Sequence, residues 1–141
     1  MEFTVVLLKP DCIQKRLVGE VIRRFEDRGL SICGCKMLRF SIELLQEHYT
    51  HHVDKPFFPA LCAFMQSAPA IALVLGGKDA ISAVRQLVGP TDSRKAPRGT
   101  IRGDFGEDAT VNVVHASDST ETAAAEMNRF FENDEVFVPT G

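Results

Sequence analysis

No apolar run in the 141-residue sequence is long enough to cross a lipid bilayer. The longest apolar stretch, from Ala68 to Leu75, is far shorter than the roughly 20 residues that a membrane-spanning helix requires. The first residues, Met1-Glu2-Phe3, also lack the charged leader and cleavage pattern of an export signal. We therefore expect a cytoplasmic location and no membrane partner.

An excess of positive charge is also missing, because the formal net charge is −3 and the sequence pI is about 5.8. The chain has no overall field that would attract a nucleic acid, and we expect no nucleic-acid partner. Any anionic ligand must be bound by a local cluster of cationic side chains. The four cysteines occur without an export signal, which favours reduced thiols over a disulfide framework.

The composition is otherwise that of an ordinary globular protein, with 45% hydrophobic and 25% charged residues. A length of 141 residues is typical of one domain, and the sequence contains neither an internal repeat nor a linker. We therefore expect residues 1–141 to form a single domain around one hydrophobic core.

Hydrophobic periodicity predicts strands at residues 3–8, 30–40, 70–75 and 111–114. Apolar residues at helical spacing predict helices over residues 13–28 and 79–88, and a short helix that contains Leu61 and Met65. Two further helices are expected to begin at capping residues, one running from Ser41 through His48 and the other from Ser117-Asp118-Ser119 to Phe131. Gly76-Gly77 is expected to end the third strand. Residues 132–141 carry no regular pattern.

Residues 89–108 also lack a regular pattern, and they are too numerous for an ordinary connection between two elements. We expect a functional loop here. The order of the other elements fits an α+β, ferredoxin-like β-α-β-β-α-β fold, with an antiparallel sheet and helices on one face. The pattern alone leaves an open three-layer α/β sheet as the alternative.

His115 directly follows the predicted fourth strand and precedes the last helix, whose first N–H groups attract phosphate. Imidazole is nucleophilic when one nitrogen is free, and Glu126 in that helix is placed to bind the other nitrogen. An isolated histidine at a strand end is more often an ordinary packed or capping residue. The loop favours the functional interpretation, because it brings Arg102, with Thr100 nearby, shortly before His115.

Other cationic and hydroxyl groups can join this site, namely Arg85 on the preceding helix, Thr91 just beyond it, and Lys9 at the end of the first strand. Arginine forks match phosphate oxygens geometrically, whereas lysine supplies a compact positive charge. The remaining basic residues of the loop are interpreted as solvated surface residues: Arg94, Lys95 and Arg98.

Phe57-Phe58 lies between two prolines, where one ring can stack on a nucleotide base while the other ring packs inward. The alternative, with both rings in the core, is equally compatible with the sequence. His48, His51 and His52 have the spacing of zinc ligands, but no second ligand cluster accompanies them. We therefore favour solvated or phosphate-facing histidines.

The segment from Asn112 to Ser119 resembles the N-x-x-H-[GA]-S-D-S signature of nucleoside diphosphate kinases. Further matches occur in the same order along nearly the whole chain, at Lys9-Pro10-Asp11, His48-Tyr49, Lys55-Pro56-Phe57-Phe58, Gly89-x-Thr91 and the segment from Gly99 to Phe105. Several motifs in the right order and spacing make a chance similarity a poor explanation.

The resemblance implies a ping-pong cycle in which a nucleoside triphosphate, typically ATP, phosphorylates His115 and a second nucleoside diphosphate collects the group. It implies Mg²⁺ as a cofactor that arrives on the nucleotide and has no protein ligands. Stacking without contacts to the base edges also predicts low base specificity. The implied assembly is a homo-oligomer, a hexamer in preference to a tetramer.

The resemblance also assigns roles by position. It assigns base binding to Phe57 and Leu61, and ribose binding to Lys9 and Asn112. Phosphate binding is assigned to His52, Arg85, Thr91 and Arg102. Tyr49 is implied to donate to the phosphoryl region, and Glu126 with Ser117 to position the imidazole. Each of these residues stands where the family pattern places it.

The sequence departs from the family pattern at a few positions. His51 replaces an acidic residue that is linked to the metal through water, and Ala109 replaces a larger aliphatic residue of the base clamp. Pro97-Arg98 displaces a proline of the loop, and the C-terminal segment is shorter than in many eukaryotic members. The alternatives to an enzyme are a nucleotide- or nucleic-acid-binding regulator and a scaffolding protein. Neither alternative needs the complete set of catalytic and phosphate-binding residues that the chain retains.

Overall fold

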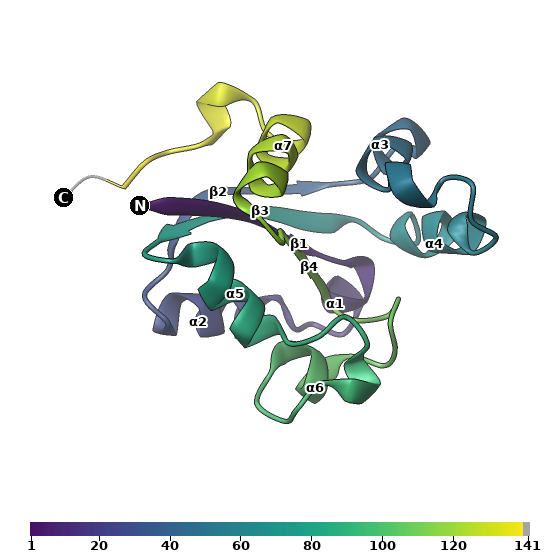
Figure 1. The fold of residues 1–141 in the computed structure, drawn as a ribbon, viewed down its shortest axis with the longest axis horizontal. Coiled ribbons are helices and arrows are strands. Elements are labelled where there is room, and N and C mark those ends of the chain that lie inside the picture. The colour runs from purple at the N-terminus through teal and green to yellow at the C-terminus, as the bar shows by residue number, and fades with distance from the viewer. Residues whose placement is uncertain (140–141) are drawn as a thin grey trace.

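The computed structural model describes residues 1–139, and these contain one four-stranded sheet. The strands are β1 (Glu2–Leu8), β2 (Ser31–Leu38), β3 (Ala70–Gly77) and β4 (Val114–Ala116). They lie in the order β2-β3-β1-β4, and each neighbouring pair is antiparallel. Figure 1 shows the sheet nearly edge-on, with helices above and below it.

The helices are α1 (Pro10–Gln14), α2 (Val18–Asp27), α3 (Ile42–His48), α4 (Phe58–Met65), α5 (Ala80–Val88), α6 (Ile101–Phe105) and α7 (Thr120–Phe130). Short 3₁₀ turns are found at Thr50–His52, Ser93–Lys95 and Asn133–Glu135. The antiparallel sheet and the alternation of its strands with α2 and α5 give the predicted ferredoxin-like arrangement. None of the helices in residues 1–139 combines the length and the apolar character that a bilayer span requires.

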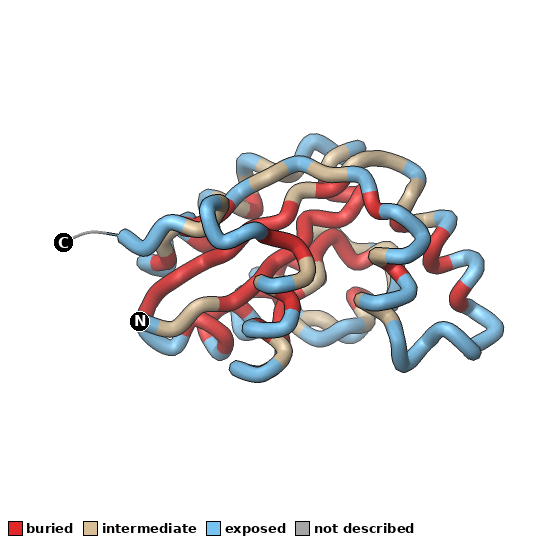
Figure 2. The backbone as a smooth tube through the Cα atoms, turned by 90° about the horizontal axis from the view of Figure 1, so that it is seen from above, coloured by how far each residue is buried: buried red, intermediate tan, exposed pale blue. Residues whose placement is uncertain are grey.

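Helices cover both faces of the sheet, so the expectation of a single covered face and one core is wrong. Alternate residues of β1 enter two separate hydrophobic clusters, with Val6 and Leu8 in one and Val5 and Leu7 in the other. The first cluster is closed by α2 and α5, and the second by α3, α4 and α7. Figure 2 shows the buried residues gathered in the middle of the molecule, with exposed residues mostly around its outside. A strand that is buried on both faces is apolar at every position, so its sequence lacks the apolar–polar alternation that distinguishes a covered face from a free one. The second layer of helices could therefore not be read from the strand pattern.

Two predicted boundaries were wrong. Residues 13–28 form no continuous helix, because α1 ends at Gln14 and Arg16 adopts the left-handed conformation with φ of 59° before α2 begins. Gly76-Gly77 continues β3 instead of ending it, since these glycines pair with Phe3 and Glu2 of β1. The Ser41 cap is confirmed, because its hydroxyl accepts a hydrogen bond from the Leu44 backbone N–H at 3.1 Å.

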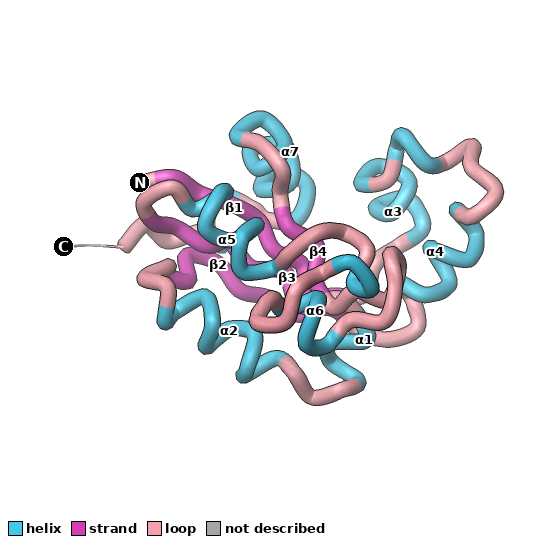
Figure 3. Tube along the Cα trace, turned by 60° about the horizontal axis from the view of Figure 1, so that its bottom comes forward, coloured by secondary structure: helices cyan, strands magenta, loops and turns pink. Residues whose placement is uncertain are grey.

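Residues 89–108 are ordered and partly helical, whereas the sequence predicted a loop alone. Thr100 caps α6 by accepting from the Gly103 N–H at 3.0 Å, and Figure 3 shows the short helix packed within its flanking loops. A β-carbon on Gly103 would lie 2.0 Å from the carbonyl oxygen of Pro97, so only glycine permits this close approach. The fold of this segment turns the Arg102 side chain toward the interior.

Strand β4 begins later than predicted. Val113 has a φ of 75°, and the Val114 N–H donates to the Asn112 carbonyl at 2.8 Å, which closes a tight turn before the strand. His115 therefore lies in the middle of β4, opposite Leu7 of β1, and does not follow the strand as predicted. The turn places Asn112 beside the end of β1, where Lys9 begins the next segment.

Candidate active site

A cleft of about 640 Å³ lies at the end of the sheet where β1 and β4 meet the segments around α3, α4 and α6. Every site residue predicted from the sequence lines this cleft except Ser117: Lys9, Tyr49, His52, Phe57, Leu61, Arg85, Thr91, Arg102, Asn112, His115 and Glu126. Ser117 is fully buried, and its hydroxyl donates a hydrogen bond to Glu126, which does line the cleft. Segments far apart in the sequence thus converge as predicted.

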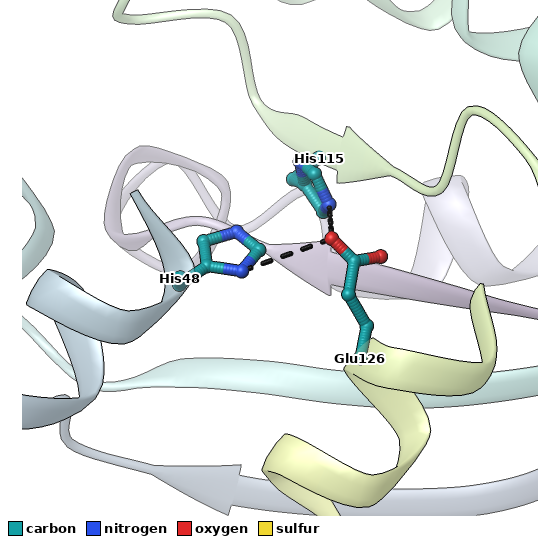
Figure 4. A group of neighbouring side chains, drawn as sticks. All are labelled: His48, His115 and Glu126. Atoms are coloured by element: carbon teal, nitrogen blue, oxygen red, sulfur yellow. Dashed lines mark hydrogen bonds and ion pairs between the residues drawn. The ribbon is translucent and has the colours of Figure 1, made fainter. Parts of the chain in front are cut away.

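The His115 imidazole is held through its Nε2 atom, which lies 2.7 Å from Oε2 of Glu126 (Figure 4). The other carboxylate oxygen, Oε1, accepts a hydrogen bond of 2.5 Å from the Ser117 hydroxyl. An ionised carboxylate only accepts hydrogen bonds, so Nε2 carries the imidazole proton. In the neutral ring the Nδ1 lone pair is then available for attack, and the side chain is 25% exposed toward the cleft.

Ser117 connects this array to the central strand. The backbone N–H of Val5 donates to the Ser117 hydroxyl oxygen at 3.2 Å, which leaves the hydroxyl proton for Glu126. Glu126 is itself buried on α7. Both oxygens of the carboxylate are thus fixed, and the orientation of the imidazole follows from the packing of α7 on β1.

Lys9 is a buried cation at the end of β1, with only 5% of its surface exposed. Its ammonium donates to Oδ1 of Asn112 at 2.7 Å and to the carbonyl of Thr110 at 2.8 Å. Burial lowers the pKa of Lys9 to about 8; Arg102 acts in the same direction, and nearby carboxylates oppose it. The Asn112 amide donates in turn to the carbonyls of Thr91 and Ala109, so one hydrogen-bonded group fixes this wall of the cleft.

Arg102 is held by two backbone carbonyls. Its Nη2 donates to Val114 at 2.7 Å and its Nη1 donates to Gly89 at 3.0 Å. Burial, with Arg85 as a second cause, lowers the pKa of Arg102 to about 10, so the guanidinium is still charged at neutral pH. Arg85 and Thr91 are exposed in the same cleft, whereas the other basic residues of the segment are exposed outside it, as predicted: Arg94, Lys95 and Arg98.

The two adjacent phenylalanines have opposite environments. Phe58 is buried in the core, whereas the Phe57 ring is 51% exposed at the cleft. Leu61, one turn further along α4, also borders the cleft. The interpretation with one ring inward and one ring free is confirmed, and the alternative with both rings packed is wrong.

The three histidines at zinc-ligand spacing do not converge. His51 and His52 are exposed in the 3₁₀ turn, whereas His48 turns inward, so the expected solvated environment is wrong for His48. Among residues 1–139, the potential ligands that converge are His48, His115 and Glu126, with ligand atoms within 4.8 Å of one another. Both Glu126 oxygens are already engaged, and the Arg129 guanidinium lies 2.9 Å from Nδ1 of His48. This trio is therefore a poor cation site, and all four cysteines are free thiols.

Sequence reasoning did not include His48 and Arg129 among the candidate site residues. The His48 side chain is 3% exposed, and its ring meets the His115 ring edge to face, with 4.7 Å between the centroids. Arg129 and Glu126 are three residues apart on α7, a spacing that places both on one helix face. That spacing was the available signal for Arg129.

A model of the family described as nucleoside diphosphate kinase matches residues 2–136. The chain belongs to this family. A nucleoside diphosphate kinase of Staphylothermus marinus is 52% identical over 135 residues, which cover 96% of each protein. One of Archaeoglobus fulgidus is also 52% identical, over 96% of this chain and 90% of the relative.

Solved structures show the same relationship. A halophilic nucleoside diphosphate kinase from Halobacterium salinarum, in complex with CDP, is 43% identical and superimposes with a TM-score of 0.95. The match covers 99% of this chain and 93% of that structure. The ferredoxin-like fold is confirmed over the open α/β alternative, although helices do form a layer on each face of the sheet. The chain is accordingly an enzyme that transfers a phosphoryl group between nucleoside triphosphates and diphosphates, in a family that uses a divalent metal.

Proposed function

We propose that residues 1–141 form one nucleoside diphosphate kinase domain in which Nδ1 of His115 carries the transferred phosphoryl group. The observation that supports this most directly is the array of Ser117, Glu126 and His115 at the edge of a cationic cleft. The array orients the imidazole, and in the neutral ring Nδ1 is the nitrogen that is free to attack.

The proposed cycle has two mirrored half-reactions. In the first, the Nδ1 lone pair attacks the γ-phosphorus, the bond from that phosphorus to the bridging oxygen breaks, and the nucleoside diphosphate leaves. In the second, a terminal oxygen of another diphosphate attacks the phosphorus, and the N–P bond breaks. The phosphorylated ring retains its Nε2 proton and gains positive charge, which the Glu126 carboxylate stabilises at 2.7 Å.

Phosphoryl transfer requires mainly alignment and neutralisation of charge. We propose that Arg85, Arg102, Thr91 and His52 bind the phosphates. Tyr49 donates to the phosphoryl group, because burial raises the pKa of its hydroxyl far above the ordinary value and keeps it protonated. Mg²⁺ bound to the phosphate oxygens would neutralise further charge, and the lack of a free carboxylate cluster in residues 1–139 favours entry of the metal on the nucleotide.

The nucleoside would occupy the remainder of the cleft. The free face of Phe57 stacks on the base with Leu61 beside it, while Lys9 and Asn112 bind the ribose hydroxyls. The CDP complex of the Halobacterium salinarum relative supports a nucleoside diphosphate as the ligand. Stacking is available to every base, so we expect broad base specificity.

Replacement of Phe57 by alanine is expected to weaken binding of every nucleotide by about 1–3 kcal/mol, because stacking on the ring is lost. The measurement is the Kd for ADP, GDP and CDP by calorimetry. Phe137, which is 70% exposed outside the cleft, provides the control, and Phe137→Ala should bind all three nucleotides normally. A loss confined to one base would contradict stacking as the source of affinity.

Nucleotide capture is expected to weaken as the pH rises through about 8. The lowered pKa of Lys9 means that the free enzyme loses this ammonium above that pH, whereas an ordinary lysine stays charged to about 10.5. The measurement is kcat/KM from pH 7 to 9.5, which reports groups of the free enzyme. Lys9→Gln should have a low kcat/KM that lacks this decline, and an identical decline in that variant would exclude Lys9 as its origin.

The covalent intermediate is tested by mixing the enzyme with γ-labelled ATP and no acceptor. We expect about one label per chain, stable in alkali and labile in acid, and its release as labelled GTP when GDP is added. Initial rates with two substrates should give the parallel reciprocal plots of a ping-pong cycle. Transfer without any labelled protein would indicate direct transfer and would contradict the proposal.

We propose a cytoplasmic location, and the resemblance to the family favours a homo-oligomer, a hexamer over a tetramer. A mass by light scattering distinguishes the two assemblies. A regulator or a scaffold in place of the enzyme is disfavoured, because the cationic groups and the oriented imidazole are kept together in one cleft.

A further inference from the structure

Two side chains behind the catalytic histidine form a unit that the proposed cycle leaves unused. His48 ends α3 and Arg129 lies on α7, and their side chains are 3% and 16% exposed. Nη1 of Arg129 lies 2.9 Å from Nδ1 of His48. The same Nδ1 atom lies 3.7 Å from Oε2 of Glu126, the oxygen that binds His115 (Figure 4).

The contact with Arg129 fixes the tautomer of His48. A guanidinium can only donate hydrogen bonds, so Nδ1 of His48 is the acceptor and the ring proton resides on Nε2. In this form His48 has no N–H group directed at Glu126. The ring is also enclosed by Tyr49 and Phe130, with centroid distances of 4.7 and 5.2 Å.

The charges around His48 act in the same sense. Burial lowers the pKa of His48 to about 2, and His115 of β4, Arg129 of α7 and Lys9 at the end of β1 all contribute to this lowering. Glu126 is the one anionic group within 4 Å of the ring among residues 1–139, and Glu47 lies beyond, 3.6 Å from Nε of Arg129. His48 therefore stays neutral, although the neighbouring Glu126 carboxylate by itself would favour the protonated, positively charged ring.

A competition for Glu126 follows from these distances. Oε2 accepts from His115 at 2.7 Å and lies 3.7 Å from His48. With a proton on Nδ1, His48 would donate to the same oxygen, and a charged His48 would form an ion pair with it. Either change would weaken the hydrogen bond that keeps the His115 proton on Nε2 and leaves its Nδ1 free.

We propose that Arg129 is a positioning residue that acts through His48, and that its hydrogen bond to Nδ1 of His48 reserves the Glu126 carboxylate for His115. The inference rests on the proposed role of His115 as the phosphoryl carrier. A second observation supports a function for this guanidinium beyond stability. Its Nε is buried and makes no hydrogen bond, only the 3.6 Å ion pair with Glu47, so the one side-chain hydrogen bond of Arg129 within residues 1–139 is the contact with His48.

The first test is the state of His48 in the wild-type enzyme. Imidazole ¹⁵N NMR should show Nε2 protonated and Nδ1 unprotonated, with no titration of His48 between pH 8 and 5. A proton on Nδ1, or titration near the ordinary value of 6.5, would overturn the proposal. This measurement needs no variant, so it remains decisive even where a substitution prevents folding.

The second test is Arg129→Leu, assayed at saturating Mg-ATP and GDP. We expect kcat to fall roughly tenfold with little change in KM, because the nucleophile and not the nucleotide is affected. The fall should deepen relative to wild type as the pH drops, because loss of the Arg129 charge raises the pKa of His48, although burial still holds that pKa below the ordinary value. Arg129→Lys, which keeps a donor and a charge, should recover part of the kcat.

The double variant His48→Phe/Arg129→Leu separates positioning from packing. It lacks the titrating ring, so the additional loss at low pH should disappear even if kcat stays low. Arg98→Leu, at an exposed position outside the cleft, is the matched arginine control. Unchanged kcat and pH profile in Arg129→Leu, with normal labelling of His115, would overturn this inference alone. Absence of phosphohistidine in the wild type would instead overturn the proposed function.

Discussion

Replacement of His115 by alanine is expected to lower kcat by about ten-thousandfold or more, the scale at which loss of a catalytic nucleophile acts. Among residues 1–139, no other side chain that lines the cleft is placed to substitute for it. His48 is adjacent, but its Nδ1 accepts from Arg129 and its side chain is 3% exposed. Ser117 is buried, and its hydroxyl is committed to Glu126.

His115→Gln is the informative partner of the alanine variant. An unpaired buried carboxylate oxygen in His115→Ala should cost about 1–3 kcal/mol of unfolding free energy. The amide of His115→Gln can still donate to Glu126, so this variant should lose less stability. It should be as inactive as His115→Ala, because an amide nitrogen is not nucleophilic. Label transfer and urea unfolding measure the two effects separately. Substantial labelling of either variant would place the phosphoryl group on another residue.

Replacement of Arg102 by methionine is expected to reduce kcat/KM by about a thousandfold, the lower range for an arginine that stabilises a phosphoryl-transfer transition state. The guanidinium is fixed by Val114, next to His115, and by Gly89 at the end of α5. It therefore needs little reorganisation when the phosphates arrive. Its charge also lies in a buried setting, where screening by water is weak.

The same substitution should destabilise the fold, since the Val114 and Gly89 carbonyls lose their donor, at about 1–3 kcal/mol for each group that stays buried and unpaired. Arg102→Lys keeps the charge but cannot span both carbonyls, so it should retain part of the activity and still lose stability. Arg94→Met is the matched control, because Arg94 is exposed in the same segment, lies outside the cleft and pairs with Asp92. Equal losses in the Arg94 and Arg102 variants would exclude a specific role for Arg102.

The strands and most helices were predictable because their residues repeat with the period of the element. The errors occur where a single backbone conformation overrides the local pattern. Arg16 and Val113 adopt positive φ angles, which no side-chain periodicity reports, and each moves the boundary of an element. The helix α6 was missed because glycines and prolines surround it, and only the Thr100 cap indicated a helix.

The convergence of the candidate residues in one cleft followed the prediction, because their chemistry and their resemblance to a family both depend on sequence; their individual roles stay predictions. The two environments of Phe57 and Phe58, and the convergence of Lys9 with Asn112, follow the prediction. The interaction of His48 with Arg129 did not follow from any motif. It depends on how α3 packs against α7, a tertiary contact that the sequence pattern does not encode locally.

The most direct test of the account is the position of phosphorus on the histidine ring. The enzyme would be phosphorylated with ATP and kept at alkaline pH. The intact protein, or the peptide that contains His115, would then be studied by ³¹P and ¹⁵N NMR. Because Glu126 holds Nε2, the account predicts one phosphoryl group coupled to Nδ1 of His115. A phosphoryl group on Nε2, or on any residue other than His115, would contradict it.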